Sequence, residues 1–458
     1  MAEVVASRKS LTINPLKMSQ PLGGAMAFMG VDSCMPLLHG SQGCTAFGMV
    51  LLVRHFREAI PFQTTAMNEV TTILGGLDNL EQACVNIHKR TQCRVIGICT
   101  TGLTETRGED LAGDIRLIRQ RHPELDGVAL VAVPTPDFSG ALQTGWAKAV
   151  TAMVEQLVQP ASGSVAGQVN ILAGSHLTPG DIEEIREMVE AFGLEPIILP
   201  DLSGSLDGHV PDHYVGTTYG GTTVEDIRAM GASVHTIAIG RQMGPAAEAL
   251  AAKAGVPFTV LDRLTGLVAV DAFVRLLQKI SGRGAPPKVR RQRSQLQDAM
   301  LDGHFSFGRT KVALAAEPDL LFSLSAFLAE MGGEVVTAVT SVESPVLDLV
   351  PAARVVVGDM DDFERSAAEQ GAALLMTHSH GRMVAHRLGV PLFRVGFPMF
   401  DRLGAAHQRT VGYKGTRDLI FALGNLLIEH SHEDGPDEWP PLGTGVPVED
   451  GHAPAATH

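Results

Sequence analysis

The sequence predicts an α/β protein with parallel sheets, divided into three lobes of similar construction. The main observation is a unit that recurs along the chain: a short run of aliphatic and β-branched residues, a loop rich in Gly, Pro, Asp or Ser, and then an amphipathic helical stretch. This alternation is typical of βαβ units. The length of 458 residues exceeds what one hydrophobic core usually supports, and 45% hydrophobic against 19% charged residues suits a large globular body.

The first lobe is expected over residues 1–165. Strands are predicted at residues 94–101 and 128–134, because both are short apolar runs bounded by turn residues. Helices at residues 108–121 and 140–158 follow these strands.

The second lobe is expected over residues 166–285. Its predicted elements are strands at residues 169–173, 196–199, 234–239 and 258–261 and a helix at residues 179–192. Thr222 and Glu225 have the spacing of a capping box, which predicts a helix start after the pair Gly220 and Gly221. Such a turn explains this glycine pair without a bound dinucleotide.

The third lobe is expected over residues 286–432. A linker is predicted before it at residues 281–293, which are rich in Gly, Pro, Lys and Arg and lack apolar periodicity. The predicted elements that follow are strands at residues 311–316, 334–339, 354–357 and 373–377 and a helix at residues 416–428. Residues 433–458 are acidic and rich in Pro, so we expect a flexible acidic tail there.

The charge and the hydropathy pattern exclude several classes of partner. A net charge of −14 repels phosphate backbones and anionic lipids, so we expect no nucleic acid and no membrane partner. Residues 1–14 lack the apolar core of a secretory signal, and apolar stretches such as residues 47–53 end well before the roughly 20 residues that cross a bilayer. We therefore expect a cytoplasmic protein.

Two groups of residues could carry metal chemistry. His378 and His380 follow a predicted strand and could bind a metal or a small acid, but two histidines without a carboxylate or cysteine beside them are more often polar loop residues. The sparse, odd set of five cysteines does not resemble a disulfide framework, so these residues are expected to be reduced thiols or metal ligands: Cys34, Cys44, Cys84, Cys93 and Cys99.

Cys44 has the most ligand-like setting, because residues 39–44 (His-Gly-Ser-Gln-Gly-Cys) lead into an apolar-patterned helix. Glycines let a backbone approach a bulky group, and the free N–H groups of a helix start favour a thiolate over a thiol. Ser41, Gln42 and Gly43 could donate hydrogen bonds to sulfur atoms nearby. The alternatives are a small buried cysteine and a loop whose residues serve its geometry alone.

Several motifs in the same order resemble the nitrogenase molybdenum-iron protein α/β superfamily, over nearly the whole chain. The motifs are residues 13–15, 20–25 and 39–44 at the start, residues 100–102 and 108–110 in the first lobe, and residues 395–398 and 400–402 in the third. The resemblance implies three Rossmann-like domains of the nitrogenase component 1 type, with the cluster-ligand motif in the first.

The departures from the family pattern concern the cysteines. In the nitrogenase β chain, cysteines in the first-domain motifs bind the larger P-cluster, whereas Met18 and Gly102 stand at two of those positions here. Cys34 and Cys99 are offset from the ligand positions and are expected to be packing residues. Cys44 alone remains in register.

A four-iron cluster takes four cysteine thiolates, so the resemblance implies a 4Fe-4S cluster shared with a partner chain that supplies three of them. This pattern is similar to the β-like subunits of the NifEN family, the scaffolds on which the nitrogenase iron-molybdenum cofactor matures. The resemblance implies a NifE-like partner in an α2β2 heterotetramer that mainly holds the cofactor precursor. It further implies NifB as precursor donor, apo-nitrogenase as acceptor and the nitrogenase iron protein as electron donor.

Three classes of function can be compared on these features. The resemblance favours an assembly scaffold that does not turn over a substrate. The alternative is an enzyme subunit, either the nitrogenase β chain or the B component of a protochlorophyllide reductase. Met18 and Gly102 argue against the β chain, whereas the spacing does not exclude the second enzyme. A small-molecule binding protein with periplasmic-type lobes lacks support, since residues 1–14 do not resemble an export signal.

Overall fold

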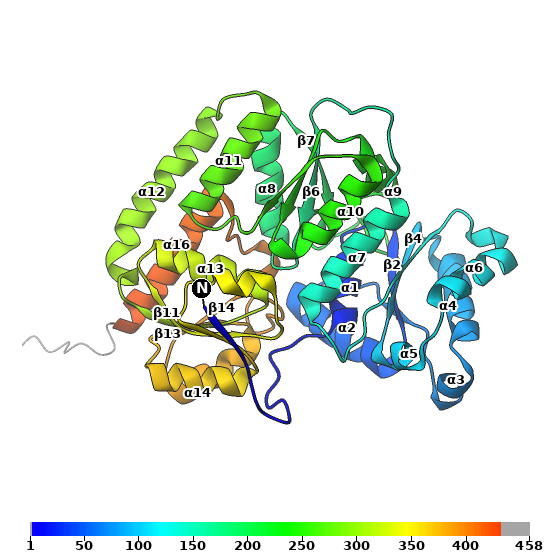
Figure 1. Cartoon of the computed structure of the whole chain (residues 1–458), viewed down its shortest axis with the longest axis horizontal. Coiled ribbons are helices and arrows are strands. Elements are labelled where there is room, and N and C mark those ends of the chain that lie inside the picture. Colours follow the sequence, from blue (N-terminus) through cyan, green and yellow to red (C-terminus); the bar gives the residue numbers. More distant parts are fainter. Residues whose placement is uncertain (1, 432–458) are drawn as a thin grey trace, which may run out of the picture.

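A computed structural model of the protein describes residues 2–431 and contains three sheets in which all strand pairs are parallel (Figure 1). Helices cover the faces of each sheet. The predicted α/β class and its three parallel-sheet units are confirmed.

The first sheet has the strand order β3-β2-β4-β5. Its strands are β2 (Cys34–His39), β3 (Gln63–Thr64), β4 (Val95–Thr100) and β5 (Ala129–Val133), and the helices of this unit are α1 (Gln20–Phe28), α2 (Gln42–Phe56), α3 (Glu69–Leu74), α4 (Leu77–Thr91), α5 (Gly102–Arg107), α6 (Leu111–Arg121) and α7 (Leu142–Leu157). Every residue of β4 is buried, as is typical of parallel strands covered on both faces. A Cβ atom on Gly97 of β4 would lie 2.3 Å from the Phe28 ring, so this glycine lets α1 pack directly on the sheet.

The second sheet has the order β7-β6-β8-β9. This unit comprises β6 (Gln168–Ala173), α8 (Pro179–Ala191), β7 (Glu195–Leu199), α9 (Val224–Ala229), β8 (His235–Ile239), α10 (Gly244–Ala254) and β9 (Phe258–Leu261). The predicted capping box is wrong by one residue, since Thr223 and Asp226 cap α9. Thr222 instead donates its hydroxyl to the carbonyl of Ile198.

The third sheet has the order β1-β12-β11-β10-β13-β14. Its strands are β1 (Glu3–Ala6), β10 (Lys311–Ala315), β11 (Glu334–Thr340), β12 (Arg354–Val357), β13 (Leu374–Thr377) and β14 (Leu392–Arg394), and the helices around it are α11 (Leu267–Ser281), α12 (Pro287–Phe307), α13 (Pro318–Glu330), α14 (Met360–Gln370), α15 (Arg382–Leu388) and α16 (Gly412–Ser431). The predicted linker at residues 281–293 is wrong over most of its length, because α12 begins at Pro287. This helix packs along α16 and buries only a sparse apolar set that includes Val289 and Leu296.

The N-terminal segment crosses to the third sheet, where β1 pairs in parallel with β12 (Figure 1). Lys9 then inserts its ammonium group among three carboxylates of α14 and its cap, at 2.7 Å from Asp359, 2.9 Å from Asp361 and 3.2 Å from Asp362. The backbone N–H of Ile13 donates to Asp359 at 2.7 Å. This acidic cluster therefore holds a lysine of the same chain and ties residues 3–13 to the third unit.

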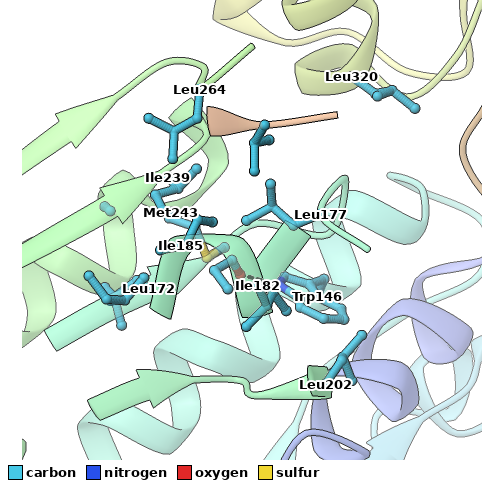
Figure 2. Close-up of a cluster of buried hydrophobic side chains, with 14 of the residues drawn as sticks. Trp146, Leu172, Leu177, Ile182, Ile185, Leu202, Ile239, Met243, Leu264 and Leu320 are labelled. Atoms are coloured by element: carbon cyan, nitrogen blue, oxygen red, sulfur yellow. Dashed lines mark hydrogen bonds between the residues drawn. The ribbon is translucent and has the colours of Figure 1, made fainter. Parts of the chain in front are cut away.

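The three units share one continuous hydrophobic core. Figure 2 shows Trp146 of α7 among apolar side chains of the second unit, including Leu172 and Ile182. The indole Nε1 of Trp146 donates to the carbonyl oxygen of Ala173 at 2.8 Å, which satisfies the polar end of a fully buried side chain. The first and second units are therefore packed against each other.

The described part of the chain has no helix that combines the length and the apolar character needed to cross a membrane. The predicted acidic tail at residues 433–458 lies outside the described residues.

Candidate functional site

Cys44 lies in the first turn of α2, where the chain leaves the end of β2. Its side chain is exposed, and its Sγ atom lies 3.5 Å from the hydroxyl of Ser41, the residue that precedes the helix. The first N–H groups of a helix have no partner within the helix and carry a partial positive charge. The position therefore suits a thiolate that binds a metal.

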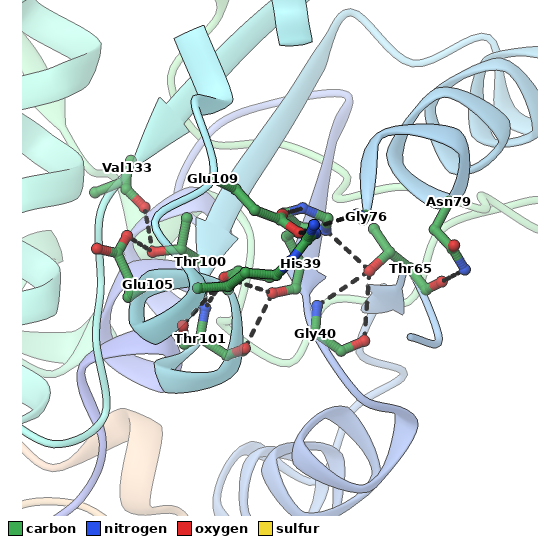
Figure 3. A network of polar contacts seen from close by, with 12 residues as sticks. His39, Gly40, Thr65, Gly76, Asn79, Thr100, Thr101, Glu105, Glu109 and Val133 are labelled. Atoms are coloured by element: carbon green, nitrogen blue, oxygen red, sulfur yellow. Dashed lines mark hydrogen bonds and ion pairs between the residues drawn. The ribbon is translucent and has the colours of Figure 1, made fainter. Parts of the chain in front are cut away.

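A buried polar network holds the end of β2 in place (Figure 3). The His39 ring contacts Glu109 at 2.8 Å through Nε2 and Thr65 at 3.1 Å through Nδ1, and the N–H of Gly40 donates to the same threonine at 3.0 Å. Burial raises the pKa of Glu109, but hydrogen bonds from His39 and the N–H of Gly76 bring it below its usual value. The turn that leads from β2 to Cys44 thus starts from a rigid point.

The two glycines of this loop have different environments. A Cβ atom on Gly40 would lie 2.3 Å from the hydroxyl oxygen of Thr101, so the close approach of the Thr101 side chain to this backbone requires a glycine. A Cβ atom on Gly43 would meet nothing within 4 Å. Gly43 and Cys44 both face open space, where another molecule could approach.

The other four cysteines are buried, as expected for packing residues. Cys34 and Cys99 lie within β2 and β4, and burial raises the pKa of both thiols, that of Cys99 to about 12. Burial likewise raises the pKa of Cys84 to about 12 and that of Cys93 above its usual value. These thiols stay protonated near neutral pH, and the five cysteines offer one exposed sulfur, that of Cys44.

Met18 and Cys44 line the same cavity, whose volume is about 390 Å³. Asp137 lines it as well and accepts a hydrogen bond from the N–H of Gly102 at 2.8 Å. The three motif positions of the first unit therefore surround one place. A Cβ atom on Gly102 would have its nearest neighbour, the Phe138 ring, at 3.5 Å, which is ordinary van der Waals contact. There is room for a side chain at this position.

His380 also lines this cavity, although it comes from the third unit. Sequence reasoning did not connect it with Cys44, because only the packing of the third unit against the first brings the two residues to one cavity. His378 beside it is buried, and burial, followed by the neighbouring His380, lowers its pKa to about 4. The two histidines occupy a packed corner of the fold and not an open polar loop.

Large apolar side chains are exposed near Cys44. Phe47 of α2, which lines the same cavity, is 67% exposed, and Phe138 beside Gly102 is 69% exposed. Val50 of α2 and three residues of α3 are exposed too: Val70, Ile73 and Leu74. Large apolar side chains exposed in this way are typical of a site of contact with another protein.

The glycine pair Gly220 and Gly221 is confirmed as a turn before a helix. Both residues have positive φ, and a Cβ atom on Gly220 would lie 1.9 Å from the carbonyl oxygen of Gly204. Close backbone packing explains the pair fully.

Comparison with known proteins gives the family. A family model described as nitrogenase component 1 type oxidoreductase matches residues 19–428. A relative from Bradyrhizobium diazoefficiens, described as nitrogenase iron-molybdenum cofactor biosynthesis protein NifN, is 56% identical over 458 residues, which cover 99% of this chain and 97% of the relative. The chain belongs to the nitrogenase component 1 type family, in its NifN group.

A second member of the NifN group, from Mesorhizobium japonicum, is 54% identical over 447 residues and covers 96% of both chains. Among solved structures, one described as nitrogenase Cp1 at pH 6.5 matches with a TM-score of 0.89 and 31% identity, over 94% of this chain and 96% of the other. The family resemblance and the nitrogenase component 1 type of fold are thereby confirmed.

Proposed function

We propose that this chain is the β-like subunit of a cytoplasmic scaffold complex for biosynthesis of the nitrogenase iron-molybdenum cofactor. Its relatives in the NifN group are described as nitrogenase iron-molybdenum cofactor biosynthesis proteins, which supports the proposal. The observation that supports the proposal best is the single exposed cysteine, Cys44, at a helix start beside a cavity and among exposed apolar side chains.

The proposed cluster is a 4Fe-4S cluster at the interface with a NifE-like partner. Such a cluster takes four thiolates, and Cys44 is the one exposed cysteine that this chain can give. Three thiolates then come from the partner, and the apolar side chains of α2 and α3 fit burial in that interface. We propose the α2β2 heterotetramer as the assembled form.

The residues around Cys44 fit this task. Cys44 would hold one iron, and the hydroxyl of Ser41 already lies against its sulfur. The backbone N–H groups of Gln42 and Gly43 belong to the first turn of α2, where they can donate to sulfur. When bound, the cluster supplies one-electron transfer, with the nitrogenase iron protein as the proposed donor.

The larger cofactor precursor is proposed to sit mainly in the partner. In this chain, the cavity where the three units meet is lined by residues such as His176, Glu317 and His378 and has a volume of only about 30 Å³. That volume holds one or two water molecules. We therefore assign to this chain a supporting role in maturation, with NifB as precursor donor and apo-nitrogenase as acceptor.

A subunit of a nitrogenase-like reductase is the alternative function. The similarity in fold and sequence to a structure described as nitrogenase Cp1 supports this alternative. Met18 and Gly102 argue against a P-cluster, since they leave Cys44 without the other cysteines that a nitrogenase β chain provides. A scaffold that is not itself a reductase accounts better for these residues.

The test is Cys44→Ala in the complex of this chain with its partner, purified without oxygen. We expect a loss of about four iron atoms per pair of subunits and of the paramagnetic four-iron signal. Cys93→Ala is the matched control, because it removes the sulfur of a buried cysteine and should leave the iron content unchanged. Unchanged iron and spectrum in the Cys44 variant would refute the shared cluster.

A further inference from the structure

His380 is placed against the cavity of Cys44 by a rigid platform of the third unit. Its ring stacks edge-on against Phe400, with centroids 5.1 Å apart, and against His378 at the same distance. Its backbone N–H donates to Nδ1 of His378 at 3.3 Å. The side chain is therefore oriented before anything binds in the cavity.

Phe400, which supports the His380 ring, is itself held from several sides. Arg54 of α2 lies over the Phe400 ring with its guanidinium carbon 4.3 Å from the centroid, and Arg382 lies over it at 5.4 Å. The N–H of Phe400 donates to the hydroxyl of Ser379 at 2.9 Å. Cation–π contacts of this kind tie the third unit to the helix that carries Cys44.

The two ring nitrogens of His380 have different surroundings. Nδ1 is buried and has no hydrogen-bond partner within residues 2–431, whereas Nε2 is not buried. Nδ1 is left without a partner in either tautomer, as an unpaired donor or as an unpaired acceptor, so Nε2 is the ring nitrogen that can reach a group in the cavity. With its proton on Nε2, the neutral ring is a donor there and not a metal ligand. Burial, and then the charges of Arg382 and Arg54, lowers the pKa of His380 and keeps the ring neutral.

We propose that His380 is a positioning residue for the metal centre at Cys44, and that its Nε2–H donates a hydrogen bond to sulfur of that centre across the shared cavity. The inference rests on the proposed function. A hydrogen bond to sulfur stabilises the reduced, more negative state of an iron-sulfur cluster, so it raises the reduction potential. His380 would thus tune the cluster without being one of its ligands.

The experiment compares two variants of similar shape in the intact complex, H380Q and H380M. Glutamine can place an N–H near the position of Nε2, whereas methionine cannot donate. We measure the midpoint potential of the cluster by titration followed by electron paramagnetic resonance, together with iron content. We expect full iron in both variants and a more negative midpoint in H380M than in H380Q and the wild type. H386L, which changes an exposed histidine of α15, is the control and should leave the midpoint unchanged.

Equal midpoint potentials in H380M and H380Q would overturn the inference. Failure of the H380M complex to assemble while the H380Q complex assembles would also overturn it, because His380 would then be needed for assembly and not for the reduction potential of the cluster. Failure of the proposed function is a separate result: there the Cys44→Ala complex keeps its iron. If that complex loses its iron and H380M still has the wild-type midpoint, only the role of His380 is wrong.

Discussion

Gly40→Ala tests whether the loop of Cys44 depends on close packing against Thr101. The new methyl carbon would lie 2.3 Å from the threonine hydroxyl and 2.7 Å from its methyl group. Overpacking costs about 1–3 kcal/mol, and displacement of the threonine breaks its 3.1 Å hydrogen bond to the carbonyl of His39, which is worth about 0.5–1.5 kcal/mol. The expected destabilisation is roughly 2–4 kcal/mol.

The assay is thermal unfolding of the complex, with iron content measured on the same samples. A loss of roughly 2–4 kcal/mol lowers the midpoint by about 2–4 °C in a chain of this size. Because the Cys44 loop shifts while its cysteine remains, we also expect partial loss of iron. Gly127→Ala is the control, since a Cβ atom there meets nothing within 4 Å.

The same substitution in a Thr101→Ala protein tests whether Thr101 causes the loss of stability. Thr101→Ala removes both groups that the new methyl would strike, so Gly40→Ala should cost much less in that background. Strictly additive effects of the two substitutions would refute the reasoning.

Three further predictions concern other parts of the fold. Gly102→Cys should keep the stability within about 1 kcal/mol of the wild type in thermal unfolding, because a Cβ atom fits at 3.5 Å from its nearest neighbour; a larger loss would contradict the room inferred there. Burial raises the pKa of Asp319 to about 6, so its contribution to stability is present below about pH 4 and is lost as the pH rises through 6. Asp319→Asn should remove this dependence and gain up to about 3 kcal/mol at pH 7 in denaturation experiments, and an unchanged pH profile would count against it. Lys9→Met should lower the free energy of unfolding by about 1–3 kcal/mol, because the side chains of Lys9 and Asp359 are 21% and 4% exposed and their ion pair is intermediate between a surface pair and a buried pair. Limited proteolysis should then cut the N-terminal segment faster in the variant. Equal rates of cleavage would contradict the proposed attachment of this segment to the third unit.

The sequence predicts those elements of the fold whose signal is local. Strands β9 and β12 have the predicted bounds, because a short apolar run between turn residues predicts each of them. The start of α12 was not predicted, because this helix has many basic residues and only a few apolar ones, so its apolar periodicity is weak. The few apolar residues are buried by packing on α16, which the sequence does not reveal. The cap of α9 is displaced by one residue because Thr222 is engaged elsewhere, by the carbonyl of Ile198.

The candidate site also combines features that the local sequence predicts with features that depend on tertiary packing. The helix start at Cys44 follows from residues next to one another in sequence, and so does its glycine-rich approach. The share of His380 in the same cavity depends on how the first and third units pack, across more than 300 positions of chain. No local pattern encodes such a contact. The exposure of Phe47 could not be predicted either, because an apolar helix position looks the same whether it faces the core or a partner.

The pairing of β1 with β12 has a consequence for how the protein is made. Glu3 pairs with Arg354, so during synthesis β1 waits for a strand that is made 351 residues later. At about 5–20 residues per second, that wait lasts roughly 20–70 s. Until β1 arrives at its place, β12 is an open sheet edge that invites pairing with other chains. A bulky group fused directly before β1 would therefore hinder folding of the third unit.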